Sequence, residues 1–166
     1  MSKPLLLLDV DGVLCPFGVS EPHDLIREDF LDAQDEVMPV WHSREITDRV
    51  YRLMDTFEIH WCTGWGDDAN KYISPVLGLP EFPVCPIPTM SLSIHWKFKA
   101  IQAYVKGRPY AFVDDDISRE AVELMKQSEI PCLWVPVRCS VGLTEPHIDA
   151  LEEWAENLYA MDRNST

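Results

Sequence analysis

Short apolar runs alternate with amphipathic segments along this chain. The run Leu5–Leu8 is apolar at every position, which is typical of a strand covered on both faces of a sheet. Three further strands are predicted at 58–62, 110–113 and 131–135, where short apolar runs recur. Segments with apolar residues at helical spacing separate these runs. This order predicts an α/β fold of the Rossmann-like type, with three layers, α/β/α, around a mostly parallel sheet of about five strands.

The predicted helices carry local signals for their ends. Ser43 suits the N-cap of the helix before the second strand, and Thr144 suits the start of the last helix. Pro75 interrupts or restarts a short helix, because proline lacks the amide proton that a helix interior uses. Gly107 and Pro109 are expected to end the helix before the third strand. These signals agree with the alternation of strand and helix.

Two segments depart from this alternation. Residues 15–42 contain proline and glycine without a clear helical pattern, so we expect an irregular insertion or small flap, with a hairpin at 36–41 as one option. Residues 78–95 are rich in proline and are expected to cross the surface as an extended connection. Neither segment is large enough for a cap domain. We therefore expect a single domain over 1–166, an open site, and a frayed polar tail at 162–166.

Composition and charge narrow the function classes. With 46% apolar and 25% charged residues, the chain has an ordinary globular composition, which argues against disorder and a coiled coil. Its 14 basic and 28 acidic side chains give a net charge of −14. Such a charge repels phosphate backbones and disfavours a dedicated nucleic-acid binder. The negative net charge is still compatible with an enzyme that holds one nucleotide through a metal.

Cysteine spacing and hydropathy indicate the compartment. The five cysteines show no CxxC spacing, so neither a disulfide framework nor a zinc site is indicated. Buried reduced thiols are the simpler interpretation, and they favour a cytoplasmic protein. The N-terminal apolar run ends at Asp9, too early for a signal peptide, and no apolar stretch of about 18 residues occurs. We expect no membrane association and no obligate protein partner.

Chemically capable side chains follow the predicted strands. The carboxyl ends of parallel strands meet at one edge of a sheet, where open α/β sheets hold their ligands. Residues just beyond these ends, or at a helix start near the same edge, are Asp9, Asp11, Thr63, Lys97, Asp114, Asp115 and Asp116. We therefore expect carboxylates, one hydroxyl and one ammonium group to converge on one crevice.

Such a set fits phosphoryl chemistry. Converging carboxylates repel each other and raise each other's pKa unless a cation offsets their charge. Oxygen-only ligands favour a hard cation such as Mg²⁺. One carboxylate can then attack phosphorus, and a second can protonate the leaving oxygen and later activate water. An ammonium and a hydroxyl group can stabilise the phosphoryl oxygens.

These motifs resemble those of the haloacid dehalogenase (HAD) superfamily. After the four leucines, Asp-Val-Asp-Gly-Val-Leu at 9–14 resembles its first motif. Thr63 at a strand end resembles the second motif, and Lys97 resembles the third. The acidic pair Asp114 and Asp115 resembles the fourth. All four occur in the family's order between residues 5 and 116. The resemblance implies a HAD-type fold and, without a large cap, a capless phosphohydrolase.

The resemblance also implies roles for these residues. Asp9 would be the nucleophile and a Mg²⁺ ligand. Asp11 would be the general acid/base and would offer its backbone carbonyl to the metal. Thr63 and the amide of Gly64 would bind the phosphoryl group, and Lys97 would neutralise the nucleophile and the phosphate.

The acidic fourth motif leaves a choice of ligand. The resemblance favours Asp115 as the direct metal ligand, with Asp114 orienting Asp115 or Lys97. Asp114 also stays a candidate ligand, and the role of Asp116 stays open.

A finer pattern concerns the substrate. The segments 63–65, 77–80 and 142–144 are similar to the HAD domains grouped with Swiss Army Knife RNA repair proteins. That similarity implies a phosphate on a nucleotide or at a 3′ or 5′ nucleic-acid end. Trp65 is a candidate for stacking on a base, with packing as the alternative. The one local basic cluster is either a solvated helix face or a patch for a polyanion, and it consists of Arg44, Arg49 and Arg52.

The sequence thus predicts a Mg²⁺-dependent phosphomonoesterase that works through an aspartyl-phosphate on a small-molecule or nucleotide phosphate. The alternative is a phosphoacceptor or a non-catalytic binding domain on a HAD-like scaffold. Response-regulator receivers place the phosphoacceptor after a middle strand, unlike Asp9 here. A dehalogenase of this superfamily would not keep Asp11.

Overall fold

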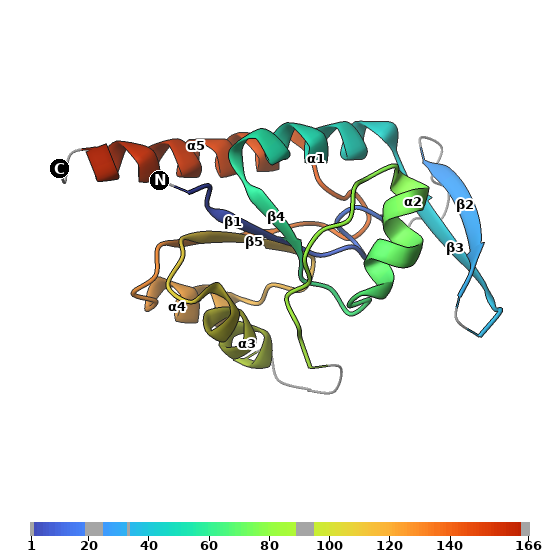
Figure 1. The fold of residues 1–166 in the computed structure, drawn as a ribbon, viewed down its shortest axis with the longest axis horizontal. Helices are drawn as coiled ribbons and strands as arrows, with labels where there is room; N and C mark the ends of the chain where they lie inside the picture. Colours follow the sequence, from blue (N-terminus) through green and yellow to red (C-terminus); the bar gives the residue numbers. More distant parts are fainter. Residues whose placement is uncertain (1, 19–24, 33, 89–94, 164–166) are drawn as a thin grey trace.

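The computed structural model describes residues 2–18, 25–32, 34–88 and 95–163. Its centre is a four-stranded sheet in the order β4-β1-β5-β6, and every neighbouring pair of strands is parallel (Figure 1). The strands are β1 (Leu5–Leu8), β4 (Glu58–Trp61), β5 (Tyr110–Asp114) and β6 (Cys132–Pro136). The parallel order confirms the predicted α/β fold, and β1, the first strand in the chain, lies inside the sheet.

Helices cover both faces of this sheet. Helices α1 (Arg44–Thr56) and α5 (Glu145–Arg163) lie on one face, and α3 (His95–Val105) and α4 (Arg119–Lys126) lie on the other (Figure 1). The side chains of β1 alternate between two buried clusters. Leu6 and Leu8 pack with residues of α1 and α5, whereas Leu5 and Leu7 pack with residues of α3 and α4. A strand buried on both faces is apolar at every position, which is why its sequence shows no alternation.

The sheet has four strands among the described residues, where the sequence predicts about five. Beside β4 the proline-rich connection forms only a single parallel bridge, between Trp61 and Val84. Two backbone hydrogen bonds hold this bridge, from Trp61 N to Pro83 O at 2.8 Å and from Cys85 N to Trp61 O at 2.7 Å. Pro83 and Pro86 have no amide proton to donate, so the pairing cannot continue as a regular strand.

The predicted insertion at 15–42 contains an antiparallel hairpin of β2 (Ile26–Leu31) and β3 (Val37–His42). The option of a hairpin at 36–41 corresponds to β3, while 19–24 and 33 lie outside the described residues. The two strands form their own sheet, beside α2 (Ser74–Leu77) at one end of the molecule (Figure 1). A flap-sized element therefore stands where the sequence predicts one.

The local helix signals are visible as contacts. Ser43 Oγ accepts a hydrogen bond from Ile46 N at 3.2 Å, which confirms it as the N-cap of α1. The short helix after β4 is a π-helix, η1 (Ala69–Ile73), followed by α2, which begins at Ser74 with Pro75 in its first turn. Helix α5 continues to Arg163, so part of the predicted frayed tail is helical, and 164–166 lie outside the described residues. None of the described helices combines the length and the apolar character needed to span a bilayer.

Candidate active site

Three acidic side chains meet at the carboxyl ends of β1 and β5. Asp9 follows β1, Asp114 is the last residue of β5, and Asp115 comes directly after it. One carboxylate oxygen from each lies within 4.8 Å of the others. Asp9 and Asp114 are buried, with exposed fractions of 7% and 0%. The structure thus brings together acidic residues that lie more than 100 positions apart in the sequence.

The turn after β1 lets Asp115 approach closely. The amides of Leu14 and Cys15 both donate to Val10 O, at 2.9 and 3.0 Å, and wind residues 10–15 into a tight turn. Gly12 within this turn has a φ of +73°. A Cβ at Gly12 would lie 2.4 Å from Asp115 Oδ2. Glycine is therefore required here both for the backbone conformation and for the space that the carboxylate takes.

Burial dominates the electrostatics of Asp9. It raises the pKa of this carboxyl to about 7, and the negative charge of Asp114 adds to the effect. Lys97, a hydrogen bond from the Thr63 hydroxyl and another from Val10 N act in the opposite direction. The site therefore holds more negative charge than its own residues neutralise.

Lys97 and Asp114 form a short ion pair. Lys97 Nζ donates to Asp114 Oδ2 at 2.6 Å, and the amide of Asp116 donates to Asp114 Oδ1 at 2.7 Å. Burial alone would lower the pKa of Lys97, but the charge and hydrogen bond of Asp114 outweigh it, and the pKa is raised. Lys97 is therefore a fixed cation at the site. Of Asp116, it is the backbone that takes part, because its side chain is exposed.

Asp115 has the more accessible carboxylate of the pair. It is partly buried, and burial followed by the charge of Asp114 raises its pKa. A divalent cation among Asp9, Asp114 and Asp115 would relieve the repulsion that raises the pKa of Asp9 and Asp115. All three donors are oxygens, which suits Mg²⁺ better than a softer metal. The residues present therefore fit a Mg²⁺ site.

Thr63 and Gly64 lie beyond the end of β4, at the same edge of the sheet. Thr63 is 1% exposed and hydrogen-bonds Asp9. Gly64 is exposed, and a Cβ built on it would meet nothing within 4 Å. The space around Gly64 is open, so a phosphoryl group could approach its amide.

Asp11 lies apart from the three clustered carboxylates. Its side chain is exposed on one side and accepts a hydrogen bond from Trp65 Nε1 at 2.9 Å. Partial burial raises the pKa of Asp11, and the bond from Trp65 acts against this rise. The sequence made Trp65 a candidate for substrate stacking and gave no sign of this contact. Its partner lies 54 positions away, and no local pattern links the two.

The comparison with known proteins identifies the family. Residues 5–148 match the family model of the HAD domain in Swiss Army Knife RNA repair proteins. The chain belongs to this family. The match confirms the resemblance and supports a HAD-type phosphohydrolase. A search of the curated proteins gave no match.

The match spans every candidate residue of this HAD domain, from Asp9 to Asp115. The HAD domain keeps both aspartates of the first motif, the hydroxyl of the second, the lysine of the third and the acidic pair of the fourth. These residues occupy one edge of the parallel sheet, as their order in the chain predicts.

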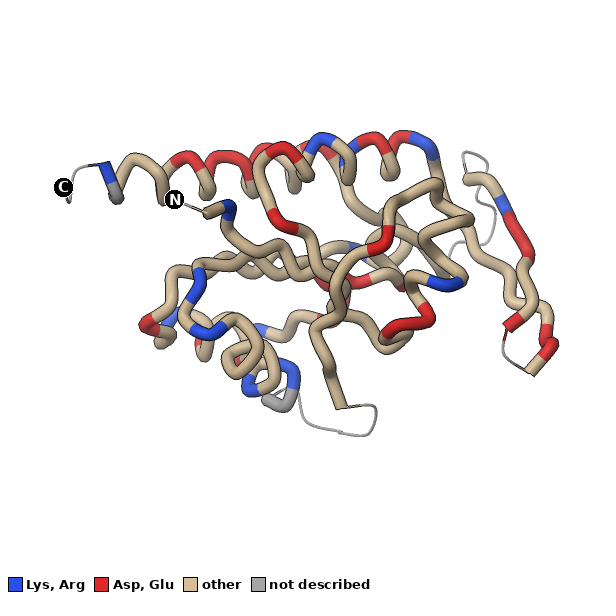
Figure 2. Tube along the Cα trace, in the orientation of Figure 1, with Lys and Arg blue, Asp and Glu red and all other residues tan. Residues whose placement is uncertain are grey.

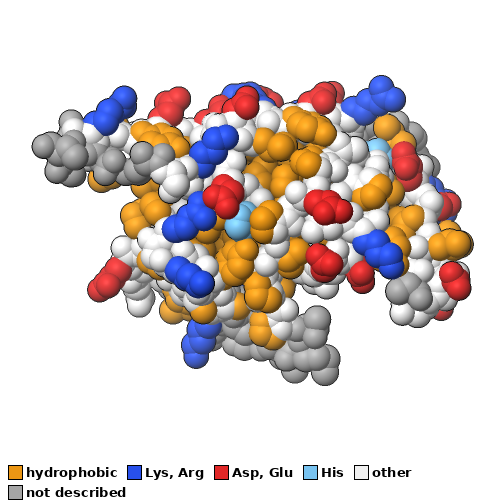
Figure 3. Space-filling model, viewed as in Figure 1, with side chains coloured by type: hydrophobic (Ala, Val, Ile, Leu, Met, Phe, Trp, Pro, Cys, Tyr) orange, Lys and Arg blue, Asp and Glu red, His pale blue; other side chains and the backbone are white. Residues whose placement is uncertain are grey.

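Two of the three arginines in the predicted basic cluster of the HAD domain, Arg49 and Arg52, form ion pairs. Arg49 contacts Glu45 and Glu145, and the guanidinium of Arg52 contacts Glu145 and, at 2.6 Å, Glu152. Acidic positions recur along α5 (Figure 2). On the face that Figure 3 presents, acidic and hydrophobic side chains lie between the basic ones. These contacts favour the interpretation of a solvated helix face.

Proposed function

We propose that this protein is a Mg²⁺-dependent phosphomonoesterase that acts through an aspartyl-phosphate on Asp9. The observation that carries the proposal is the buried cluster of Asp9, Asp114 and Asp115, with ligand oxygens within 4.8 Å of one another and Lys97 2.6 Å from Asp114. Buried carboxylates without enough cations are costly, and such sites are functional more often than structural. Membership of the HAD family supports the same chemistry.

Two steps use the residues of the site. Asp9 attacks the phosphorus while Asp11 gives its proton to the departing oxygen, so an alcohol leaves and the phosphoryl group stays on Asp9. Asp11, now a carboxylate, takes a proton from a water molecule that attacks the same phosphorus. The bond to Asp9 then breaks, which releases phosphate and restores the carboxylate. Thr63 and the Gly64 amide hold the phosphoryl oxygens, and Lys97 offsets their charge.

Asp9 and Asp115 would hold the Mg²⁺, with the backbone carbonyl of Asp11 as a further ligand. Asp114 already accepts hydrogen bonds at both carboxylate oxygens, which suits it to orienting Lys97. When bound, Mg²⁺ supplies positive charge that stabilises the charge developing on the phosphoryl oxygens.

We propose that the substrate carries a terminal phosphate on a nucleotide or a nucleic-acid end. The family is described by its occurrence in RNA repair proteins. The small hairpin at 26–42 leaves room for a large leaving group, unlike a cap domain.

We also propose a cytoplasmic location. Among the described residues all the cysteines are free, which supports a cytoplasmic location.

A test combines metal dependence with the loss of one carboxylate. Hydrolysis of 4-nitrophenyl phosphate should require Mg²⁺, stop with EDTA and return when Mg²⁺ is restored. Mg²⁺ should also raise the melting temperature of the unliganded protein, a readout independent of turnover. Asp9→Asn should abolish turnover, whereas Asp55→Asn, at an exposed position of α1, should not change it.

Two results would overturn the assignment. Undiminished hydrolysis after chelation would exclude the metal, and turnover by Asp9→Asn would exclude the nucleophile. Stoichiometric, long-lived phosphorylation of Asp9 without turnover would favour a phosphoacceptor. The presence of Asp11, which can activate water, argues against that alternative.

A further inference from the structure

We propose that Trp65 is the positioning residue of the general acid/base, and that the hairpin holds Trp65 in place through Phe30. The proposal rests on the proposed function, because it assigns Asp11 a proton to deliver. Under this proposal, Trp65 holds one oxygen of Asp11 in place by a hydrogen bond, and it does not stack on a base of the substrate.

The contact itself selects an oxygen of Asp11. Trp65 Nε1 donates to Asp11 Oδ2 at 2.9 Å, the only hydrogen bond of this carboxylate to the described residues. An indole N–H can donate but cannot accept. Oδ2 is therefore an acceptor whether Asp11 is charged or neutral, and the catalytic proton resides on Oδ1. Trp65 thus determines which oxygen faces the leaving group.

Asp11 needs such a partner more than Asp9 does. Asp9 is buried and hydrogen-bonded by Val10 N at 2.8 Å, so its own strand end fixes it. Asp11 is exposed, and an exposed aspartate side chain populates several rotamers. Proton transfer requires the acid to lie within hydrogen-bond reach of the departing oxygen. A single donor that holds Oδ2 reduces the freedom of the side chain to the productive arrangement.

One backbone contact and a chain of two ring contacts hold Trp65 in place. The amide of Trp65 donates to Thr63 Oγ1 at 3.4 Å, which ties its backbone to the phosphoryl-binding loop. The ring centroid of Phe30 lies 5.9 Å from that of Trp65, with the planes tilted by 54°. Phe30 also stacks on Tyr72 of η1, at 5.3 Å and 17°. Aromatic pairs at these distances and tilts add to the stabilisation that burial alone gives.

The hairpin therefore bears on catalysis without touching the phosphate. Phe30 is a residue of β2, and its backbone pairs with Met38 of β3. The hairpin forms its own two-stranded sheet, apart from the parallel sheet. Its link to Asp11 runs through two contacts, Phe30 to Trp65 and Trp65 to Asp11. A change in the hairpin should thus alter the proton-transfer step and leave phosphate binding unchanged.

The test uses leaving groups of different basicity. The variant Trp65→Phe keeps an aromatic side chain that can pack against Phe30 and removes the N–H donor together with part of the ring area. The control Trp154→Phe makes the same exchange at a ring that stacks on Phe57, with 6.3 Å between the ring centroids, between α5 and the end of α1. For each, kcat/KM is measured with 4-nitrophenyl phosphate, whose leaving group departs without a proton, and with an alkyl phosphate, whose leaving group needs one.

We expect Trp65→Phe to lower kcat/KM for the alkyl phosphate by about 10- to 100-fold and to change that for 4-nitrophenyl phosphate by less than about threefold. KM for a nucleotide relative to the alkyl phosphate should not change. Trp154→Phe should match the wild type with both substrates. A second variant, Phe30→Leu, should show the same pattern at smaller amplitude, and it keeps the test informative if Trp65→Phe folds poorly.

Three outcomes would overturn the proposal while leaving the proposed function intact. Equal losses with both leaving groups would mean a structural or phosphate-binding role for Trp65. A rise in KM confined to nucleotides would mean base stacking. Unchanged kinetics would mean that the contact is dispensable. Failure of the proposed function itself is distinguishable, because the wild type would then hydrolyse none of these esters with Mg²⁺.

Discussion

At the residue scale, the carboxylate of Asp115 occupies the space that a side chain at Gly12 would need. A methyl group at Gly12 would lie 2.4 Å from the Asp115 carboxylate, and the φ of +73° there disfavours any side chain. Gly78, the C-cap of α2, has a similar φ of +66° but nothing within 4 Å of its virtual Cβ. A comparison of the two glycines therefore separates the effect of backbone strain from that of displacing Asp115, the proposed metal ligand.

Alanine at each glycine tests this separation. Gly78→Ala should lower the free energy of unfolding by about 1–2 kcal/mol and leave the Mg²⁺ dependence unchanged. Gly12→Ala should carry the same backbone penalty and in addition weaken Mg²⁺ affinity by about 10- to 100-fold, because the ligand must move. Chemical denaturation and Mg²⁺ titrations of activity measure the two effects. Equal Mg²⁺ affinity in both variants would contradict the close approach as the cause.

The sequence predicts site residues well where their place follows from a strand end. Asp9, Thr63 and Asp114 could be placed together because parallel strands bring their carboxyl ends to one edge of the sheet. The partner of Asp11 could not, because the bond from Trp65 depends on how the loop after β4 folds over the turn after β1. Contacts between loops carry no periodic signal in the sequence.

At the element scale, β4 is fastened at its first residue by charged groups. Glu58 accepts one hydrogen bond from Arg108 at 2.6 Å and shares another with His60 at 3.0 Å. The same guanidinium nitrogen of Arg108 donates to the carbonyl of Lys3, just before β1. The bond from Arg108, followed by that with His60, lowers the pKa of Glu58 to about 2. These contacts connect the amino ends of β1 and β4.

This low pKa predicts an acid-sensitive contribution to stability. Because the folded pKa lies below the unfolded value, the contribution is complete above about pH 4.5 and is lost as the pH falls towards 2. Glu58→Gln should therefore be less stable than the wild type at pH 7, by no more than about 1 kcal/mol because the pair is half exposed. Urea unfolding at several pH values should show this difference shrinking below pH 4.5.

The control is Glu153→Gln, at an exposed position of α5. Its stability relative to the wild type should not vary with pH in this way. A Glu58→Gln difference that stays constant down to pH 3 would show that packing, and not the charge of Glu58, is responsible.

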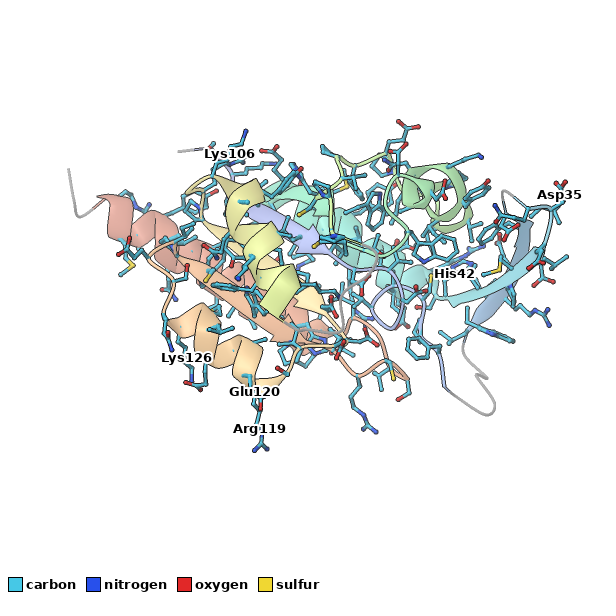
Figure 4. All side chains as sticks on the ribbon, turned by 90° about the horizontal axis from the view of Figure 1, so that it is seen from below. Asp35, His42, Lys106, Arg119, Glu120 and Lys126 are labelled. Atoms are coloured by element: carbon cyan, nitrogen blue, oxygen red, sulfur yellow. The ribbon has the colours of Figure 1, made fainter. Side chains whose placement is uncertain are left out.

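Local and long-range features of the elements differ in how well the sequence predicts them. The N-cap at Ser43 could be read from the chain because donor and acceptor are three positions apart. Arg52, by contrast, pairs with Glu152, 100 positions away, and the sequence left its role undecided between a solvated face and a polyanion patch. His42, at the end of β3 (Figure 4), lies with its Nε2 3.6 Å from Glu28 Oε1 of β2. Its ring nitrogens are buried and have no hydrogen-bond partner among the described residues.

At the scale of the whole molecule, the layer order follows directly from the sequence, because strands buried on both faces and amphipathic helices have distinct patterns. The number of strands does not follow as directly. The segment beside β4 is apolar enough to be a strand, but its prolines limit it to one bridge with Trp61. The hydrophobic pattern reports burial, whereas strand pairing also depends on the available backbone donors.

The net charge of −14 yields the last prediction, which concerns substrate length. Only the terminal phosphate is expected to be gripped, by Mg²⁺, Lys97 and Thr63, while the body of a nucleic-acid strand meets a field that repels it. Arg49 and Arg52, two of the three arginines in the basic cluster of α1, are paired with acidic side chains. We therefore expect similar kcat/KM for a mononucleotide and an end-phosphorylated oligonucleotide.

Salt provides the decisive comparison. A track that neutralised several phosphates would release counterions, and log kcat/KM would fall with log salt by about 0.7 per phosphate contacted on a single strand. A protein that grips the end alone should give a shallow slope that is nearly the same for both substrates. Arg52→Ala should leave both slopes unchanged. A steep slope with the oligonucleotide alone, lost in Arg52→Ala, would show that the α1 arginines exchange their acidic partners for the nucleic acid.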